Sequence, residues 1–294
     1  MPSREERIAE AAKHIGLVRR VFAEDTKAVV ESAKLYKEGE ARALADPKPS
    51  FDTTDVRVER TDTVSALRVA RSESEGGRVC ALDFASYTNP GGGYDRGAWA
   101  QEEALCAESN LFEILSGLRE LYYTPNKQTI RGGLYSDRAL YLTDVLFTAE
   151  AGPFKRDVIV CAAPNRSRAM EANRSAQECD NDMRRRVVTV LQIAADQHVE
   201  SLVLGAFGCG VFGNDPVFVA SAFKEWIDAH PGVFREVVFA VPGGPNLSAF
   251  EDVFGRTQHE AVEVAEDFEP EEDTSEDDAW LADNASSDGH WVFN

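Results

Sequence analysis

The stretch RVCALDFASYTNPGGG occupies residues 78–93, and QEE follows at residues 101–103 after a spacer of seven residues. The short apolar run over residues 78–84 is typical of a buried strand. The consecutive glycines at 91–93 lack Cβ atoms, so their backbone N–H groups can approach an anion closely. We therefore expect a strand, a phosphate-binding loop and then a helix over about residues 101–115.

Helical periodicity dominates the chain before this stretch. Apolar residues over 8–22 keep the spacing of an amphipathic helix, and the pattern resumes over residues 26–45. A pair of prolines at 47 and 49 then ends the helix. The pattern changes to a short β run at residues 56–60, which is followed by a capped helix from Thr63.

Strands and helices alternate from there to the end of the apolar sequence. After the glycines, the predicted strands cover residues 139–147, 158–163, 201–205 and 236–241, and the predicted helices cover residues 183–197, 216–230 and 247–254. This order is typical of a three-layer α/β/α domain with a mixed, mainly parallel sheet, which binds ligands at the carboxyl ends of its strands. We therefore predict an N-terminal helical extension (1–50), an α/β domain (51–257) and a tail (258–294).

Composition limits the class of protein. The chain has 294 residues, of which 43% are hydrophobic and 28% are charged, close to the averages of soluble globular proteins. No apolar run approaches the roughly 18 residues needed to span a membrane. The first 16 residues have neither the apolar core nor the cleavage site of a secretory signal. We expect an intracellular, cytoplasmic protein without a membrane partner.

Negative charge is concentrated at the C-terminal end. The net charge is −20, and 13 acidic residues lie between Glu260 and Asp288, with no Lys or Arg after Arg256. Such a segment buries too little apolar surface to offset its ordering entropy, so we predict a disordered tail. Its apolar patches at Trp280 and Trp291 are either docking segments for a partner or incidental parts of a solubilising tail.

The rest of the chain has no basic stripe of the kind that duplex nucleic acid requires. The short cluster Arg184, Arg185 and Arg186 stands out, but charged runs on helices usually form a solvated face. We therefore expect a solvated helix face at this cluster and no direct binding to duplex nucleic acid.

Five cysteines are spread along the chain: Cys80, Cys106, Cys161, Cys179 and Cys209. Their odd number and wide spacing fit neither a zinc site nor a disulfide framework. Cys80 and Cys161 lie within apolar runs, where a buried, inert thiol is the usual state. We expect neither a metal site nor a cysteine nucleophile.

A second glycine-rich loop, GAFGCGVFG, spans residues 205–213 and leads into a helix that begins at Pro216. The positive N-terminal end of that helix adds to the attraction for an anion. Residues 208–213 also match G-x-G-x-x-G, the dinucleotide fingerprint. That fingerprint normally opens the first strand–helix unit and needs an acidic residue about 20 positions later at a strand end, whereas Asp228 falls within the predicted helix. We therefore predict a phosphate site here rather than a dinucleotide cofactor site.

Two adjacent carboxylates, Glu102 and Glu103, lie between the first loop and its helix. Beside a bound phosphate they repel each other and the ligand, which raises one pKa toward the value useful to a general acid. Glutamates in the first turn of a helix are also favoured by the helix dipole for structural reasons alone. The residues themselves leave both interpretations open.

Taken in order, these features resemble one family. The triplet Gly91, Gly92 and Gly93, the seven-residue spacer and the triplet Gln101, Glu102 and Glu103 resemble the GGG-x(6–8)-QEE signature of poly(ADP-ribose) glycohydrolases. The preceding DFASYTNP resembles the bacterial and fungal branch, and GAFGCGVFGNDP resembles the family's diphosphate-binding loop. The resemblance covers about residues 55–256, with the helical extension that this branch also carries. It implies a macrodomain fold that binds ADP-ribose.

The resemblance also implies hydrolysis of ribose–ribose O-glycosidic bonds, which releases ADP-ribose from the ends of poly(ADP-ribose) on modified proteins. It makes Glu103 the acid that protonates the leaving ribose oxygen and Glu102 a ligand of ribose hydroxyls. The other implied binding residues belong to the two loops: Asn89, Gly91, Gly92, Gly93 and Gln101 in the first, and Gly208, Cys209, Gly210, Val211 and Phe212 in the second. The second loop takes the diphosphate on its backbone, Phe212 packs on a ribose, and no metal or other cofactor takes part.

Two other functions stay open. A macrodomain that only binds ADP-ribose is one, although it has no use for two adjacent glutamates; a mono-ADP-ribose hydrolase is the other. The spacer residues Tyr94 and Trp99 depart from the family pattern and leave the length of the substrate open. Candidates for the adenine contact are Asp83, Phe84 and Phe239, and candidates for a local positive field are Arg96, Arg131, Arg166 and Arg168.

Overall fold

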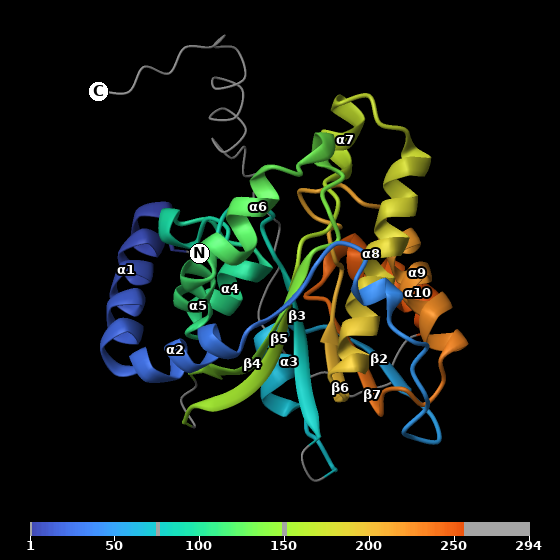
Figure 1. Ribbon diagram of the computed structural model, residues 1–294, viewed down its shortest axis with the longest axis horizontal. Coiled ribbons are helices and arrows are strands. Elements are labelled where there is room, and N and C mark those ends of the chain that lie inside the picture. The colour runs from blue at the N-terminus through green and yellow to red at the C-terminus, as the bar shows by residue number, and fades with distance from the viewer. Residues whose placement is uncertain (1, 75–76, 149–151, 256–294) are drawn as a thin grey trace.

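The computed structural model describes residues 2–74, 77–148 and 152–255, and the acidic tail with its two apolar patches lies outside them (Figure 1). Seven strands form one sheet in the order β1-β4-β5-β3-β6-β7-β2. They are β1 (Lys34–Tyr36), β2 (Asp55–Glu59), β3 (Arg78–Phe84), β4 (Ala139–Phe147), β5 (Phe154–Cys161), β6 (Val199–Leu204) and β7 (Glu236–Ala240). The strands from β5 to β2 run parallel, whereas β4 is antiparallel to both β1 and β5. The predicted mixed, mainly parallel sheet is confirmed.

Helices cover both faces of this sheet. Those described are α1 (Arg4–Val21), α2 (Ala23–Ser32), α3 (Thr63–Val69), α4 (Gln101–Ala107), α5 (Leu111–Gly117), α6 (Thr124–Lys127), α7 (Arg166–Glu171), α8 (Ala176–Asp196), α9 (Pro216–Ala229) and α10 (Gly244–Phe254). The group α1 to α5 lies on one side of the sheet, and α8 to α10 lie on the other (Figure 1). The three-layer α/β/α architecture is therefore confirmed.

The central strand β3 shows how the sequence builds two cores at once. Successive side chains of a strand point to opposite faces, so Val79 and Ala81 pack with the α1–α5 group, while Cys80 and Leu82 pack with α8 to α10. All four side chains are 7% exposed or less. A strand that is apolar on both faces is typical of the interior of a parallel sheet.

The predicted helix over residues 26–45 is wrong in its second half. Helix α2 ends at Ser32, and residues 34–36 form β1, which pairs with β4. Tyr36 and Lys34 both donate to Asp196 of α8, at 2.5 and 2.7 Å. These distant partners override the local helical pattern, because helix propensity is a weak preference beside tertiary contacts. The extension therefore supplies an edge strand of the sheet, and the division at residue 50 stays a prediction.

The predicted helix over residues 101–115 is interrupted in the structure. Helix α4 ends at Ala107 and α5 begins at Leu111. Between them, the Asn110 amide N–H donates to the carbonyl oxygen of Leu146, and the Leu146 N–H donates to Oδ1 of Asn110, both at 3.0 Å. The backbone N–H of Asn110 therefore bonds to the end of β4 instead of to a carbonyl oxygen of α4, so the helix is interrupted there.

The predicted solvated face at the arginine cluster is correct only in part. Arg184 and Arg185 are exposed and pair with Glu225 and Asp182, respectively. Arg186, in contrast, is 2% exposed and donates to backbone carbonyls in the interior. Its position beside the inward-facing Met183, Val187 and Val190 of α8 explains the difference, since residues three or four apart share a helix face.

The prediction of buried thiols at Cys80 and Cys161 is confirmed. All five thiols are free, and Cys80 and Cys161 are fully buried. Burial raises the pKa of the Cys80 thiol well above its ordinary value, which keeps this thiol protonated and unreactive. None of the described helices has the length and apolar character that crossing a membrane demands.

Candidate functional site

The two glycine-rich loops meet at one edge of the sheet. They follow β3 and β6, which are neighbouring parallel strands, so both loops leave at the carboxyl ends. Phe84 of β3 lies against Phe207 of the second loop, with ring centroids 5.4 Å apart. A Cβ at Gly205 would lie 3.0 Å from the Phe84 ring and 2.7 Å from a backbone oxygen. The topology therefore brings the two predicted phosphate loops together.

Glu102 and Glu103 are buried in the first turn of α4, at 4% and 6% exposure. Oε1 of Glu103 accepts a hydrogen bond from the Gly93 N–H at 2.8 Å, and Oε2 accepts one from the Ala100 N–H at 3.0 Å. Oε2 of Glu102 accepts from the Ser86 N–H at 2.7 Å. The first loop is therefore folded directly onto the two carboxyl groups.

This close approach depends on glycine. Gly91 and Gly92 have φ values of +66° and +58°, in the region that other residues rarely adopt. A Cβ at Gly92 would lie 2.2 Å from Oε1 of Glu103 and 3.0 Å from Oε2 of Glu102. A side chain at position 92 would thus displace the glutamates.

A third carboxyl group lies beside the pair. Asp83, near the end of β3, is fully buried, and neither of its oxygens has a hydrogen-bond partner among the described residues. Burial, followed by the charge of Glu103, raises the pKa of Asp83 well above its ordinary value. Burial and the charges of Asp83 and Glu103 likewise raise the pKa of Glu102. Hydrogen bonds from the backbone N–H groups of Ser86 and Gly91 lower it by less. Within this cluster of three carboxyl groups, Asp83 and Glu102 therefore hold protons more tightly than isolated carboxyls do.

Gln101 has partners within the protein. Its Oε1 accepts from the Phe84 N–H at 2.8 Å, and its Nε2 donates to the Leu82 carbonyl at 2.9 Å and to Oγ1 of Thr63 at 3.1 Å. These bonds fix the start of α4 against β3 and α3. The substrate contact predicted for Gln101 stays a prediction.

The second loop is a tight turn closed by Asn214. Nδ2 of Asn214 donates to the carbonyl oxygens of Gly208 at 2.9 Å and of Pro164 at 2.8 Å. Gly208 has φ +71°, and a Cβ there would lie 2.6 Å from that of Ala163. The tip is open, because Val211 is 67% exposed and nothing lies within 4 Å of a Cβ at Gly210. The tip backbone is therefore accessible to a ligand.

The N-terminal end of α9, which follows this loop, contributes less to anion binding than the sequence suggested. Oδ1 of Asp215 accepts hydrogen bonds from the N–H groups of Val217 and Phe218 at the start of α9, at 2.8 and 3.2 Å. The Asp215 carboxylate, as the N-cap of α9, thus already occupies the N–H groups that would attract an anion. The phosphate-binding capacity of the second loop rests on the loop backbone.

A row of aromatic rings joins the loops on their outer side. Tyr87, two residues before Asn89, stacks on Tyr135 with centroids 4.2 Å apart and planes at 12°. Tyr135 meets Phe212 of the second loop edge-on, at 6.3 Å. Phe212 is half-buried in this cluster, while Asn89 and Cys209 are also partly accessible. Phe212 therefore has a rigid support on one side.

The predicted adenine and arginine contacts are only partly compatible with the structure. Phe239 is fully buried among Phe223, Phe250 and Phe254, so the suggestion that it contacts adenine is wrong. Among the predicted arginines, Arg96 is exposed and donates to the carbonyl oxygen of Gly92 at 3.0 Å, beside the first loop. Arg131 and Arg166, by contrast, pair with Glu38 and Asp180.

The spacer between the glycines and the glutamates is held by helix α1. Arg7 donates to the carbonyl oxygen of Gly97 at 2.7 Å, and Nδ1 of His14 lies 3.0 Å from the Tyr94 hydroxyl. A Cβ at Gly97 would lie 2.7 Å from the backbone oxygen of Arg4. The buried Tyr94 therefore supports the loop from beneath, whereas Trp99 is 46% exposed.

Sequence reasoning missed the place of Asp83 and the aromatic row. The signal for Asp83 was present, since a lone acid within an apolar strand is rarely buried without a functional reason. The signal for Tyr87 and Tyr135 was absent, because 47 residues separate them along the chain. Among the described residues, no cluster of side chains suits a metal ion.

Comparison with known proteins agrees with this geometry. A sequence profile described as microbial-type PARG, catalytic domain, matches residues 8–149. The poly(ADP-ribose) glycohydrolase (PARG) from Thermomonospora curvata is 33% identical, with a TM-score of 0.75 over 85% of this chain and 100% of that chain. The structure of that enzyme bound to the inhibitor ADP-HPD gives a TM-score of 0.74. The Deinococcus radiodurans enzyme in complex with ADP-ribose is 35% identical, with a TM-score of 0.69 over 78% of this chain and 96% of that chain.

A search of the curated proteins returned no match. The resemblance to solved structures, however, extends over the whole of the T. curvata chain and over 85% of this chain. The profile match begins within helix α1, at residue 8. With this coverage and identity, and with its macrodomain-like sheet, the chain belongs to the microbial-type poly(ADP-ribose) glycohydrolase family.

Proposed function

We propose that this chain hydrolyses the ribose–ribose O-glycosidic bonds of poly(ADP-ribose), with Glu103 as general acid and then general base. One observation carries the proposal: Asp83, Glu102 and Glu103 form a buried cluster onto which the glycine loop is folded. Burying three acids is costly, and a module that only binds a polyanion gains nothing from negative charge at its ligand. Proton transfer to a leaving oxygen is the chemistry that such a cluster serves.

The reaction needs only the substrate, water and Glu103. Glu103 donates its proton to the leaving ribose oxygen while the bond from that oxygen to the anomeric carbon breaks. Positive charge on the anomeric carbon is stabilised by the newly formed Glu103 carboxylate and by the diphosphate of the substrate. The Glu103 carboxylate then takes a proton from a water molecule whose oxygen bonds to the anomeric carbon. The acid is restored, and water has been consumed.

The neighbouring carboxyls support this cycle electrostatically. Three acids in one buried site cannot all ionise without strong repulsion. The raised pKa values of Asp83 and Glu102 mean that the cluster retains protons where isolated carboxyls would be charged. Protons held on Asp83 and Glu102 therefore keep the negative charge of the cluster low before the polyanionic substrate binds.

The two loops bind the substrate in this proposal. Oε1 of Glu102 is buried and has no partner among the described residues, so a ribose hydroxyl that donates to it would satisfy a costly acceptor. Asn89 and the glycines 91–93 position the distal ribose. The exposed backbone of residues 208–211 takes the diphosphate, and Phe212, supported by Tyr135, packs on a ribose.

We further propose a cytoplasmic enzyme that acts on poly(ADP-ribose) attached to proteins and releases ADP-ribose without a metal ion. The cycle above contains no step that calls for a metal, since both proton transfers go through one carboxyl group. A chelator should therefore leave the rate unchanged, whereas a loss of activity that added divalent ions restore would contradict this part of the proposal.

The direct test measures ADP-ribose release from automodified polymer by the native chain and by Glu103→Gln. Glu31→Gln, an exposed glutamate on α2, is the matched control. We expect release to disappear in Glu103→Gln while ADP-ribose still binds, and Glu31→Gln to match the native rate. Retained release in Glu103→Gln would overturn the assigned acid. Tight ADP-ribose binding with no polymer hydrolysis by the native chain would favour a mono-ADP-ribose substrate or a binding module.

A further inference from the structure

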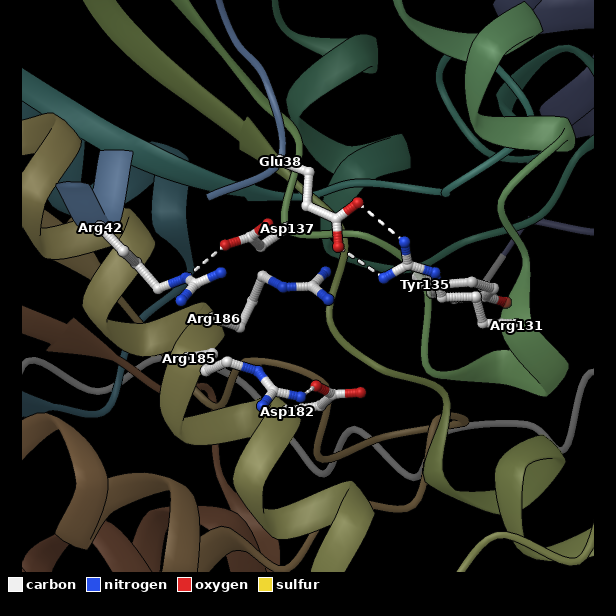
Figure 2. A pocket seen from close by; sticks show the side chains of 8 residues that line it. All are labelled: Glu38, Arg42, Arg131, Tyr135, Asp137, Asp182, Arg185 and Arg186. Carbon is white, nitrogen blue, oxygen red and sulfur yellow. Dashed lines mark hydrogen bonds and ion pairs between the residues drawn. The ribbon is translucent and has the colours of Figure 1, made fainter. Parts of the chain in front are cut away.

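A cavity of about 280 Å³ lies between α8 and the segment that follows β1 (Figure 2). Four guanidinium groups surround it, from Arg42, Arg131, Arg185 and Arg186, and Tyr135 forms part of its wall. Pockets for drug-sized ligands are typically about 300–1,000 Å³. This cavity therefore suits a small polar group rather than a whole nucleotide.

Three of the four arginines are paired with carboxylates: Arg42 with Asp137, Arg131 with Glu38, and Arg185 with Asp182. Figure 2 shows these pairs around the cavity, with no such link to Arg186. No ion pair joins Arg186 to any carboxylate in the described part of the chain. The lining thus holds four cations against three anions.

Arg186 lies at the base of the cavity as a buried cation. Its side chain donates to the carbonyl oxygens of Ala162 and of Leu134, the latter at 3.2 Å. Its Nε is buried and has no hydrogen-bond partner among residues 2–74, 77–148 and 152–255. A guanidinium cannot lose its proton in a protein, so its charge persists in the interior. Such a charge is costly unless an anion accompanies it.

The Asp137 carboxylate, which lines the same cavity, already serves other donors. Asp137 accepts from Arg42 at 2.6 Å, from the Gly39 N–H at 3.0 Å and from Thr189 at 3.0 Å. Although burial opposes the shift, the Arg42 and Gly39 hydrogen bonds and the charge of Arg186 lower the pKa of Asp137. One carboxylate thus faces two guanidinium groups, and one positive charge is left over.

We propose that this cavity binds a phosphoryl group, either phosphate or diphosphate, held by Arg186 at its base and by Arg131 and Arg185 at its rim. Arginine matches the geometry of phosphate oxygens better than any other side chain. The Arg131 and Arg185 side chains are 47% and 51% exposed, so they are free to turn from their carboxylates toward an incoming anion.

The position of the cavity connects it to the proposed active site. Ala162 directly follows β5, which pairs with β3, so Arg186 lies near the edge of the sheet that carries the glycine loops. Tyr135 touches both regions, since it lines the cavity and meets Phe212. If the proposed function holds, the second diphosphate of poly(ADP-ribose) is one source of the phosphoryl group. Free phosphate or pyrophosphate is the other.

Calorimetric titration of the full chain with inorganic pyrophosphate tests the cavity. Saturating ADP-ribose is present throughout, so that the proposed diphosphate loop is occupied. We expect pyrophosphate to bind the loaded protein, and Arg131→Gln and Arg185→Gln each to weaken that binding about five-fold or more. Arg184→Gln is the matched control, because Arg184 is on the same helix but pairs with Glu225 and lies over Phe218. No binding to the loaded native protein, or equal binding by all four proteins, overturns the proposal.

Arg186→Gln removes the charge at the base and should abolish pyrophosphate binding. Because Arg186 also joins two backbone segments, circular dichroism must first show that this variant is folded. Full binding by a folded Arg186→Gln protein contradicts the proposal. If the variant does not fold, the two rim variants decide the question.

The length of the substrate distinguishes the two sources. Poly(ADP-ribose) carries a second diphosphate beyond the scissile bond. The compound 2′-O-(ADP-ribosyl)adenosine has the same scissile bond and only the one diphosphate of its ADP-ribosyl unit. If the polymer fills the cavity, Arg185→Gln lowers kcat/KM several-fold more on polymer than on the adenosine substrate. If free phosphate fills it, the variant affects both substrates equally while the pyrophosphate titration still shows weaker binding. A native chain that hydrolyses neither substrate contradicts the proposed function, and the titration remains a test of the cavity.

Discussion

Neighbouring strands of the sheet end in buried charges of opposite sign. Asp83 lies near the end of β3 with Glu102 and Glu103, whereas Arg186 donates to the residue that follows β5. Carboxyl groups can reduce the cost of burial by keeping a proton, and the pKa values of Asp83 and Glu102 are raised accordingly. A guanidinium has no neutral form to adopt. The acidic cluster can therefore store protons for catalysis, while the basic cavity calls for an anion.

The largest effect is expected where the acidic cluster meets the glycine loop. Gly92→Ala places a Cβ 2.2 Å from the Glu103 carboxylate at a φ of +58°, and displacing a catalytic group by about 1 Å costs about 100-fold in rate. We expect kcat for polymer hydrolysis to fall by at least about that factor. Gly16→Ala, in open space on α1, should leave kcat unchanged. A fully active Gly92→Ala enzyme would show that the loop does not hold Glu103 in its working position.

Removing the buried cation should destabilise the fold. Arg186→Met leaves the Ala162 and Leu134 carbonyl oxygens without a donor, at about 1–3 kcal/mol for each unsatisfied group. We expect the free energy of unfolding in urea to fall by about 2 kcal/mol, and by less than about 0.5 kcal/mol in the exposed control Arg184→Met. If Arg186→Met were more stable than the native protein, burial of the guanidinium charge would cost more free energy than its two hydrogen bonds contribute. Arg186 would then be a destabilising buried group, as Asp83 is expected to be at pH 7.

Removing the charge of a buried acid should instead raise the free energy of unfolding. The pKa of Asp83 is raised in the folded state above its ordinary value of 3.8, so the contribution of Asp83 to stability is fully present below that pH and is lost as pH rises through the folded-state pKa. Asp83→Asn avoids that loss. We expect its free energy of unfolding to exceed the native value at pH 7 by on the order of 1 kcal/mol, with the difference shrinking toward pH 4. Asp228→Asn, at an exposed site, should show no such pH-dependent gain.

His14 is the intermediate case, a cation that can become neutral. Burial lowers its pKa below the ordinary 6.5, so its contribution to stability is present above that pH and is lost as pH falls through the folded-state value. Between pH 7.5 and 5.5, we expect the native chain to lose about 0.5 kcal/mol more than His14→Gln. Urea unfolding at both pH values measures this difference. Equal losses would show that His14 accepts a proton without cost.

The order of strands and helices was predictable because it depends on local pattern. The apolar run 78–84 and the glycines that follow it carry the signals of a strand and a loop within their own residues. Residues 34–36 carry no such signal, since they form β1 through β4 and Asp196, which are far away in the sequence. Asn110 interrupts its helix for the same kind of reason, a contact with the end of β4.

The acidic half of the site was predictable and the basic cavity was not. Glu102 and Glu103 follow the glycines within ten residues of sequence, so one motif contains them all. The arginines of the cavity come from the β1 segment, from the turn before β4 and from α8. Each is an ordinary surface residue by its local pattern. Only the folded chain shows that their charges share one space.

The edge strand β1 has a consequence for how this chain associates with itself. A chain shortened to begin at residue 51 would keep both glycine loops and the glutamates, yet it would uncover the backbone hydrogen-bonding groups of β4. Uncovered strand edges recruit other strands. We therefore expect the shortened chain to elute as dimers or larger aggregates in size-exclusion chromatography. By covering the edge of β4, the first 50 residues should keep the chain from associating with itself, an effect independent of any catalytic step.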